Sequence, residues 1–298
     1  MFYLVLSALS SIAIIMAFKF FDKYQIDTFQ AIVINYWVCV FTGSIVLGQM
    51  PVYDGIFSST WMSTAWILGT TFIAAFYFVG LSVIYFGLAV TSVVQRMSLV
   101  ISVPFAIVMF SEPATALKIT GLIAALLSVI FINIPSKKDK NKPITPKEDA
   151  KPLPKGIIFY PVLAFLVSGL VECLLQYSQR RLIGGDPSEE AIFSIWLFGV
   201  AAFIGSFAAL GMIIFGKSKF ELKNLIGGIG LGIPNYFSIY FLLRAFSWKD
   251  VSIILPINNL SVVGGAALIG FFLFRERLSK LNWLGVLLAA LAIILIAF

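Results

Sequence analysis

Ten apolar segments, each about as long as a membrane-spanning helix, run through almost the whole sequence. A helix needs about 20 apolar residues to cross the hydrocarbon core of a bilayer. The segments lie at about 2–21, 29–48, 62–86, 90–110, 114–133, 156–179, 190–215, 224–247, 250–273 and 280–297. Charged residues make up only 12% of the 298 residues, too few to cover this much apolar surface in water. The sequence therefore predicts an all-α integral membrane protein with ten transmembrane helices.

A hydrophilic stretch at residues 134–155 separates five predicted helices on each side. It contains seven lysines and five prolines, and no periodic apolar pattern. This composition is typical of a solvated linker. We expect residues 1–133 to form a first five-helix domain and residues 156–298 to form a second.

The two halves end in a similar pattern, which indicates an internal repeat. Glu112 precedes Gly121 by nine residues, Glu276 precedes Gly285 by nine, and an Ala/Leu/Ile-rich segment follows each glycine. Because five spans are an odd number, the second copy must enter the membrane from the opposite side. Two inverted five-helix repeats are a common plan among secondary transporters.

The basic residues are distributed unequally between the two predicted sides of the membrane. Of the 21 lysines and arginines, 16 follow odd-numbered segments and 5 lie on the other side. Since lysine and arginine mark cytoplasmic loops, we expect both termini outside and the linker in the cytoplasm of a bacterial-type inner (plasma) membrane. The net charge of +7 is then a topology signal, and we expect no nucleic-acid partner.

Residue types that carry catalysis or hold metals are scarce. The chain has no histidine, the commonest general base and metal ligand, and its two cysteines, Cys39 and Cys173, lie in separate apolar segments. All seven aspartates lie in loops or at segment ends, so the facing carboxylates of an intramembrane aspartyl protease are missing. We expect no enzyme activity, no metal and no cofactor.

At its two Glu-x8-Gly segments the chain resembles the drug/metabolite transporter superfamily, in its EamA-type ten-span branch. The run from Phe274 through Glu276 to Gly285 fits that pattern well, and the run from Ser111 through Glu112 to Gly121 fits it less closely. The resemblance implies a carrier that exports or exchanges small organic metabolites or drugs through a central cavity between the halves. The inverted repeat favours alternating access within one chain, and we expect a monomer or a homodimer. A channel and a non-transporting membrane scaffold are the alternatives.

Glu172 is the clearest ionisable residue at membrane depth. It belongs to one polar helical stripe with Ser168, Gln176 and Gln179. Such a stripe faces a protein interior or a water-filled cavity, because charges in hydrocarbon are costly. Glu172 is either a proton-coupling and substrate-binding carboxylate, which exchanges a proton with a cationic solute, or the partner of Arg180 or Arg181 in a structural ion pair.

Three further segments supply cavity candidates. In segment 90–110 a stripe consists of Thr91, Gln95, Ser98 and Ser102. Arg96, beside it, either extends its charge to the cytoplasmic edge or binds an anionic group of the solute.

In segment 250–273, Pro256 removes a backbone donor, and Asn258 and Asn259 either form a polar solute site or bond helices together. In segment 224–247, Asn235 precedes Tyr236 and Tyr240, whose rings either stack on a solute or pack in lipid. The complete set of candidates for solute binding is Ser168, Glu172, Gln176, Gln95, Arg96, Ser98, Asn235, Tyr236, Tyr240, Asn258 and Asn259.

Overall fold

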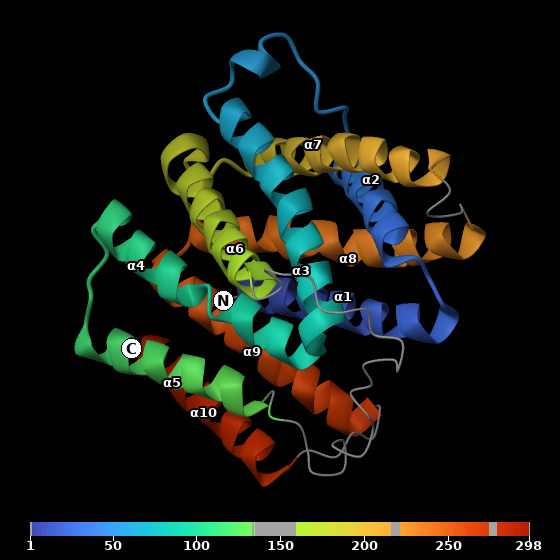
Figure 1. The fold of residues 1–298 in the computed structure, drawn as a ribbon. Coiled ribbons are helices and arrows are strands. Elements are labelled where there is room, and N and C mark those ends of the chain that lie inside the picture. The colour runs from blue at the N-terminus through green and yellow to red at the C-terminus, as the bar shows by residue number, and fades with distance from the viewer. Residues whose placement is uncertain (1, 133, 135–158, 216–220, 274–278, 298) are drawn as a thin grey trace. The chain divides into compact units, whose positions relative to one another are not determined.

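The computed structural model describes residues 2–132, 134, 159–215, 221–273 and 279–297, and this part of the chain is helical, with no strand. The helices, shown in Figure 1, are α1 (Phe2–Tyr24), α2 (Thr28–Leu47), the 3-10 helix η1 (Ile56–Ser58), α3 (Met62–Arg96), α4 (Leu99–Phe110), α5 (Ala116–Ile132), α6 (Phe159–Tyr177), the π-helix η3 (Ser178–Ile183), α7 (Pro187–Ile214), α8 (Leu222–Phe246), α9 (Val251–Leu273) and α10 (Lys280–Ala297). Two sequence predictions concern residues outside these ranges. They are the linker beyond residue 134 and the Glu276 pattern at Phe274–Leu278.

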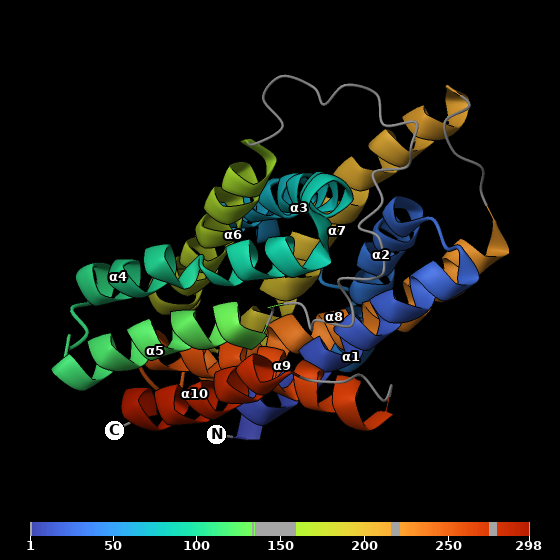
Figure 2. The same ribbon diagram turned by 60° about the horizontal axis from the view of Figure 1, so that its bottom comes forward.

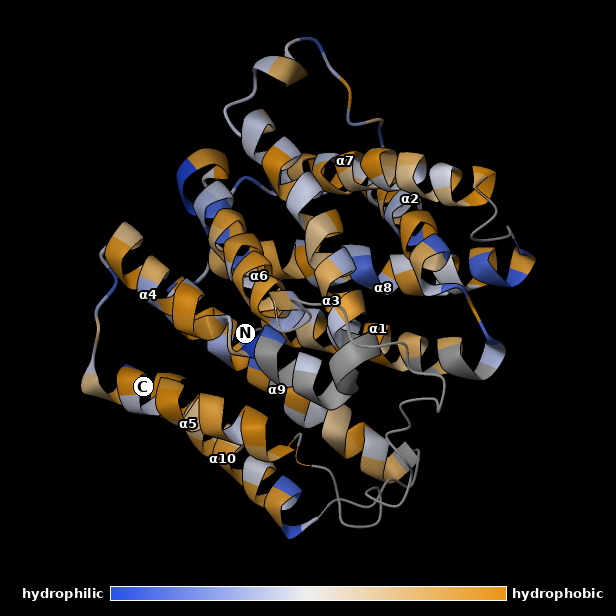
Figure 3. Cartoon of the chain, in the orientation of Figure 1, coloured by the Kyte–Doolittle hydropathy of each residue, from blue (hydrophilic) through white to orange (hydrophobic). Residues whose placement is uncertain are grey.

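Six helical stretches among the described residues are long and apolar enough to cross a membrane. They are Thr28–Leu47, Met62–Val79, Phe159–Ile183, Pro187–Ile214, Leu222–Phe246 and Val251–Phe272. Four shorter apolar stretches are Phe2–Phe18, Leu99–Phe110, Ala116–Ile132 and Lys280–Ile296. Figure 3 shows apolar residues along most of these helices. The chain is a multi-pass membrane protein.

The boundary between the third and fourth segments differs from the prediction. The sequence predicts helices at 62–86 and 90–110, whereas α3 continues to Arg96 and α4 begins only at Leu99. Gln95 and Arg96 therefore end one helix, and Ser98 stands at the N-cap of the next. The predicted stripe of segment 90–110 is divided between two helices. Hydropathy alone does not mark this break, because apolar residues lie on both sides of the turn.

Residue contacts divide the chain into two compact units, each made of two separate stretches. Unit 1 consists of Met1–Ile73 and Cys173–Ile254, and unit 2 consists of Ala74–Glu172 and Leu255–Phe298. Each unit thus contains residues from both predicted halves, 1–133 and 156–298. The repeat is a pattern along the sequence, whereas the two compact units are defined by contacts between residues that are often far apart in the sequence.

In unit 1, α8 packs against α1 and α2, and α2 also packs against α7. Two glycines one turn apart on α8 make the contact with α2 close. A methyl group added to Gly228 would lie 2.5 Å from Ile34 Cγ2, and one added to Gly232 would lie 2.5 Å from Val38 Cβ. Small residues with this spacing let membrane helices approach backbone to backbone.

In unit 2, α5 and α10 lie side by side, as Figures 1 and 2 both show. A methyl group added to Gly121 would lie 2.6 Å from Ile296 Cγ1, and one added to Gly285 would lie 2.7 Å from the Ile132 backbone nitrogen. The start of each helix thus meets the end of the other. Gly285 follows Gly121 by 164 positions, and Ile296 follows Ile132 by 164, so the two contacts are equivalent in the sequence repeat.

Replacing Gly285 by alanine is expected to lower the free energy of unfolding by about 1–3 kcal/mol, because backbone atoms of Ile132 leave no room for a methyl group. Gly230 on α8 has no atom within 4 Å of an added methyl group. Gly230→Ala is therefore the control and should be neutral or stabilising. Cys39 and Cys173 are buried, so a thiol-reactive dye reports thermal unfolding. Equal midpoints for the two variants would contradict the close packing.

Candidate functional site

Residues of three helices, all of them within unit 2, bring a cation, an amide and a carboxylate together. Arg96 ends α3, Glu172 lies on α6 and Asn259 lies on α9. Arg96 Nη1 donates to Asn259 Oδ1 at 2.5 Å, and Asn259 Nδ2 donates to Glu172 Oε1 at 3.3 Å. An asparagine amide carries both an acceptor and donors, so Asn259 links the guanidinium to the carboxylate.

A glycine on α6 lets α4 come close to this group. A methyl group added to Gly169 would lie 2.7 Å from Ile101 Cδ1 on α4. Glu172 follows Gly169 by one helical turn, and the buried side chains of Ser98 and Ser102 lie beside its carboxylate. The contact between Gly169 and Ile101 thus brings two hydroxyl groups near the carboxylate.

The group retains unused hydrogen-bonding capacity. Among the described residues, Glu172 Oε2 and Ser98 Oγ have no partner in hydrogen-bond geometry, although Ser98 lies near the carboxylate. The side-chain oxygen of Asn258, the residue before Asn259, also has no hydrogen-bond partner among the described residues. Buried polar atoms normally have a partner, so these atoms are suited to a ligand that supplies donors.

The cation near Glu172 is not one of the two arginines that the sequence suggested as its ion-pair partner. The cation near its carboxylate is Arg96, whereas the sequence suggested Arg180 or Arg181. Arg180 Nη2 instead donates to the Lys249 carbonyl oxygen at 2.6 Å. The guanidinium of Arg96 is also turned inward, toward Asn259, and does not simply extend to the end of its helix.

The other candidates divide between the units. Unit 2 contains Gln95, half-buried at the end of α3, and Ser168, whose hydroxyl oxygen is buried on α6. Unit 1 contains Gln176, which is fully buried, together with the α8 candidates. Among the sequence candidates, the structure therefore brings Arg96, Ser98, Glu172 and Asn259 into one contact group.

The α8 candidates form their own group with α2 in unit 1. Asn235 Nδ2 donates to Asn35 Oδ1 at 3.1 Å, and the Cys39 thiol donates to the Gly232 carbonyl oxygen at 3.3 Å. Tyr236 is 0% exposed, and its ring stacks on Tyr240 with centroids 5.8 Å apart. The hydroxyl of Tyr236 has no hydrogen-bond partner among the described residues. This group joins α2 to α8 and leaves one phenol available.

A buried carboxylate that was not among the sequence candidates, Glu190, is 0% exposed in the first turn of α7. Its Oε1 accepts hydrogen bonds from Gln179 at 2.6 Å and from Ser247 at 2.7 Å, and its Oε2 lies 3.3 Å from Arg244 Nη1. Gln179 lies in the π-helix that follows α6, and its side-chain amide donates to Glu190.

The sequence signal at this place marks the start of a helix rather than a site. Asp186 caps α7 by accepting from the Ser188 backbone, Pro187 stands in the first turn, and Glu189 and Glu190 follow. This is the ordinary pattern of a helix N-terminus. Which of two adjacent glutamates becomes buried depends on the helices that pack there.

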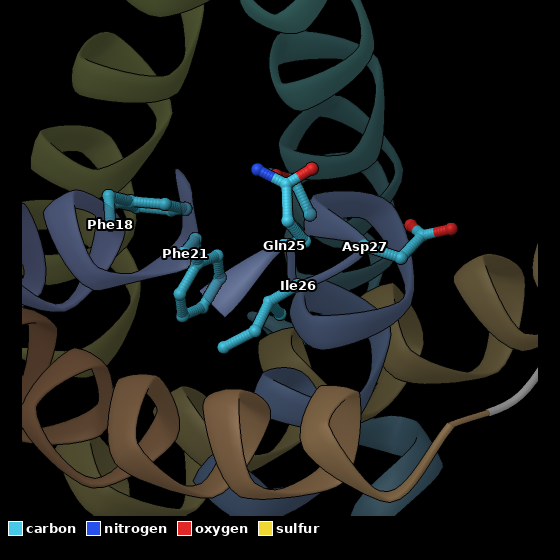
Figure 4. Close-up of a pocket in the computed structure, with 6 residues that line it drawn as sticks. Phe18, Phe21, Gln25, Ile26 and Asp27 are labelled. Carbon is cyan, nitrogen blue, oxygen red and sulfur yellow. The ribbon is translucent and has the colours of Figure 1, made fainter. Parts of the chain in front are cut away.

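A pocket of about 350 Å³ lies at the α1–α2 turn, apart from the sequence candidates. It is lined by Phe18, Phe21, Gln25, Ile26, Asp27 and Thr28. Figure 4 shows Phe21 and Ile26 together, with the polar ends of Gln25 and Asp27 pointing away from them. Among the described residues, no group of three or more metal-ligating side chains occurs.

Comparison with known proteins supports the fold. No protein-family model matches the sequence. The chain is 24% identical over 298 residues to an uncharacterized protein of Haemophilus influenzae, and the match covers 97% of this chain and 95% of the relative. A protein of known crystal structure is similar with a TM-score of 0.75 and 12% identity, over 99% of this chain and 94% of that chain. At this identity the likeness concerns the fold alone.

Proposed function

We propose that this protein is a secondary transporter that moves a small organic solute by alternating access, as a member of the ten-span EamA-type branch of the drug/metabolite transporter superfamily. The observation that carries the proposal is the Arg96–Asn259–Glu172 group. Glu172 and Asn259 lie within two of the helices that are long and apolar enough to span a membrane. The protein has no enzymatic role in this proposal and requires no cofactor.

The cost of these charged groups supports a functional role. An ionised residue at the centre of a membrane helix costs about 2.5–3.5 kcal/mol on insertion scales. A buried ion pair adds little net stability compared with apolar residues of similar size. Intramembrane ionisable groups therefore usually serve a substrate or ion pathway, and the unpartnered Oε2 of Glu172 gives a solute or a proton a place to bind.

In this proposal Glu172 is the coupling residue. Its carboxylate binds either a proton or a donor group of the solute, and Asn259 transmits the change of charge to Arg96 through their hydrogen bond. Gln95 on α3, Ser98 at the start of α4 and Asn258 on α9 are further candidates for solute contacts. A proton gradient then drives export or exchange.

The reciprocal glycine contacts of α5 and α10 support the inverted repeat. A two-fold axis in the membrane plane relates equivalent helices of such repeats and runs them in opposite directions. We propose ten spans, both termini outside and the 134–155 linker in the cytoplasm of a bacterial-type inner membrane. The transporter works as a monomer or a homodimer.

Liposomes containing the purified protein test the proposal. They are loaded with a mixture of small metabolites, and solute loss is followed with and without a pH gradient. We expect saturable, gradient-dependent loss of at least one solute class, and Glu172→Gln should abolish its gradient dependence. Glu221→Gln, an exposed position at the start of α8, is the control. No movement or binding of any solute would favour the scaffold, and non-saturable flux would favour the channel.

A further inference from the structure

The connection between α2 and α3, residues 48–61, is folded against the start of α7 in unit 1. Trp61 Nε1 donates to Glu189 Oε2 at 2.6 Å, and Tyr53 Oη donates to Glu189 Oε1 at 3.4 Å. The Pro51 carbonyl oxygen accepts from Trp196 Nε1 at 2.8 Å. These bonds fix the connection to one helix.

This ordered connection exposes apolar side chains. Gly55, with a φ of 88°, turns the chain into η1, where Ile56 is buried and Phe57 points outward at 69% exposure. Met50 is 74% exposed and Val52 is 67% exposed. Phe57 also contacts the ring of Trp196, at 5.4 Å between centroids. Three large apolar groups therefore project from a connection whose backbone is fixed.

The charged residues of this connection indicate which type of lipid headgroup it would contact. Residues 48–61 contain no lysine or arginine, and Asp54 is their only charged residue. The neighbouring Glu189 adds a second carboxylate. The exposed Arg181 lies at the other end of the connection, where Thr60 Oγ1 donates to the Leu182 carbonyl oxygen at 3.5 Å. The connection itself has no basic residue, so it is better suited to zwitterionic headgroups than to anionic ones, because basic residues supply attraction to anionic lipid.

We propose that Met50, Val52 and Phe57 insert into the headgroup region of a zwitterionic lipid leaflet and anchor the start of α7 at the membrane surface. The connection joins two helices that are long and apolar enough to cross the bilayer, so it cannot lie far from that surface. Tyr53, which is 42% exposed, is an amphipathic aromatic residue of the kind that favours this depth. The anchor is independent of solute transport.

Spin labels test the depth of insertion. Cysteines are introduced singly at Phe57 and Val52, labelled with a nitroxide, and studied in phosphatidylcholine nanodiscs that hold only this protein. Collisions with oxygen report lipid and collisions with a water-soluble nickel chelate report water. Labels at Phe57 and Val52 should favour oxygen, whereas a label at Asp54 should favour nickel. Phe207, 63% exposed on α7, serves as the hydrocarbon reference.

Unmutated protein carried through the same labelling gives the background, since Cys39 and Cys173 are buried. Each labelled variant must keep the unfolding temperature of the unmutated protein. The proposal is overturned if the label at Phe57 is as accessible to nickel as the label at Asp54. In nanodiscs rich in phosphatidylglycerol, shallower insertion of Phe57 supports the zwitterionic preference, and deeper insertion overturns that preference.

Discussion

Replacing Arg96 by methionine is expected to lower the free energy of unfolding by about 3 kcal/mol, because the carboxylate of Glu172 then lacks its cation. Glu172→Gln should cost less, since glutamine is neutral and keeps a similar shape. In the double variant the loss should be smaller than the sum of the two single losses, by about 1–2 kcal/mol. The coupling passes through Asn259, which bonds to both side chains.

The chain offers a matched control for this cycle. Lys223 and Glu221 form an ion pair at 2.8 Å with both side chains about half exposed. Exposed pairs contribute about 0–1 kcal/mol, so Lys223→Met and Glu221→Gln should be nearly additive. Unfolding is measured in nanodiscs by thermal denaturation with the thiol-reactive dye. Additive losses for Arg96 and Glu172 would show that the bridge through Asn259 carries no coupling.

Replacing Asn282 by leucine is expected to lower the free energy of unfolding by about 3 kcal/mol. Its side-chain nitrogen lies 3.0 Å from the Phe131 carbonyl oxygen, 2.7 Å from that of Ile132 and 2.9 Å from that of Ile134. The Asn282 side chain thereby caps the C-terminal end of α5. Leucine supplies no donor, and each buried carbonyl without a partner costs about 1–3 kcal/mol.

The sequence repeat extends this prediction to Lys118, which stands 164 positions before Asn282. Lys118 is only 7% exposed, although it is a lysine near the start of an apolar helix. Because the start of α5 meets the end of α10, a donor at this position suits the last carbonyls of α10. We expect Lys118→Met to be destabilising and Lys118→Asn to restore part of the loss.

Lys280, exposed at the start of α10, is the control for Lys118. Lys280→Met should change the unfolding temperature little, because its charge is solvated. If Lys118→Met is as stable as Lys280→Met, the equivalence of α5 and α10 does not extend to their capping groups. Thermal unfolding in detergent compares the variants directly.

Several local features could be predicted from the sequence because they depend on neighbouring residues. Apolar runs predict the helices, and Asp186 followed by Pro187 marks the start of α7. The polar spacing on α6 identified Glu172, and the structure joins it to Asn259 and Arg96, which were also candidates. These residues could be singled out because polar groups are costly in hydrocarbon and are therefore conspicuous in an apolar sequence.

Other features follow only from packing. Nothing local separates Glu189 from Glu190, yet Glu190 is enclosed by side chains of α8 and the π-helix. At the turn between α3 and α4, Gln95, Arg96 and Ser98 are interspersed with apolar residues, so the sequence is equally compatible with a polar stripe on one helix and with a break between two.

By itself, the sequence determined a membrane-embedded helical chain and the residue types of its polar groups, because helix formation and apolar burial depend on residues a few positions apart. The tertiary structure alone decided which polar groups meet. Arg96 and Asn259 are 163 positions apart in sequence, and their contact depends on how α3 and α9 are placed in the folded chain. It also decided that Asn235 bonds to Asn35 of α2, because such a pairing depends on the close fit of helix surfaces.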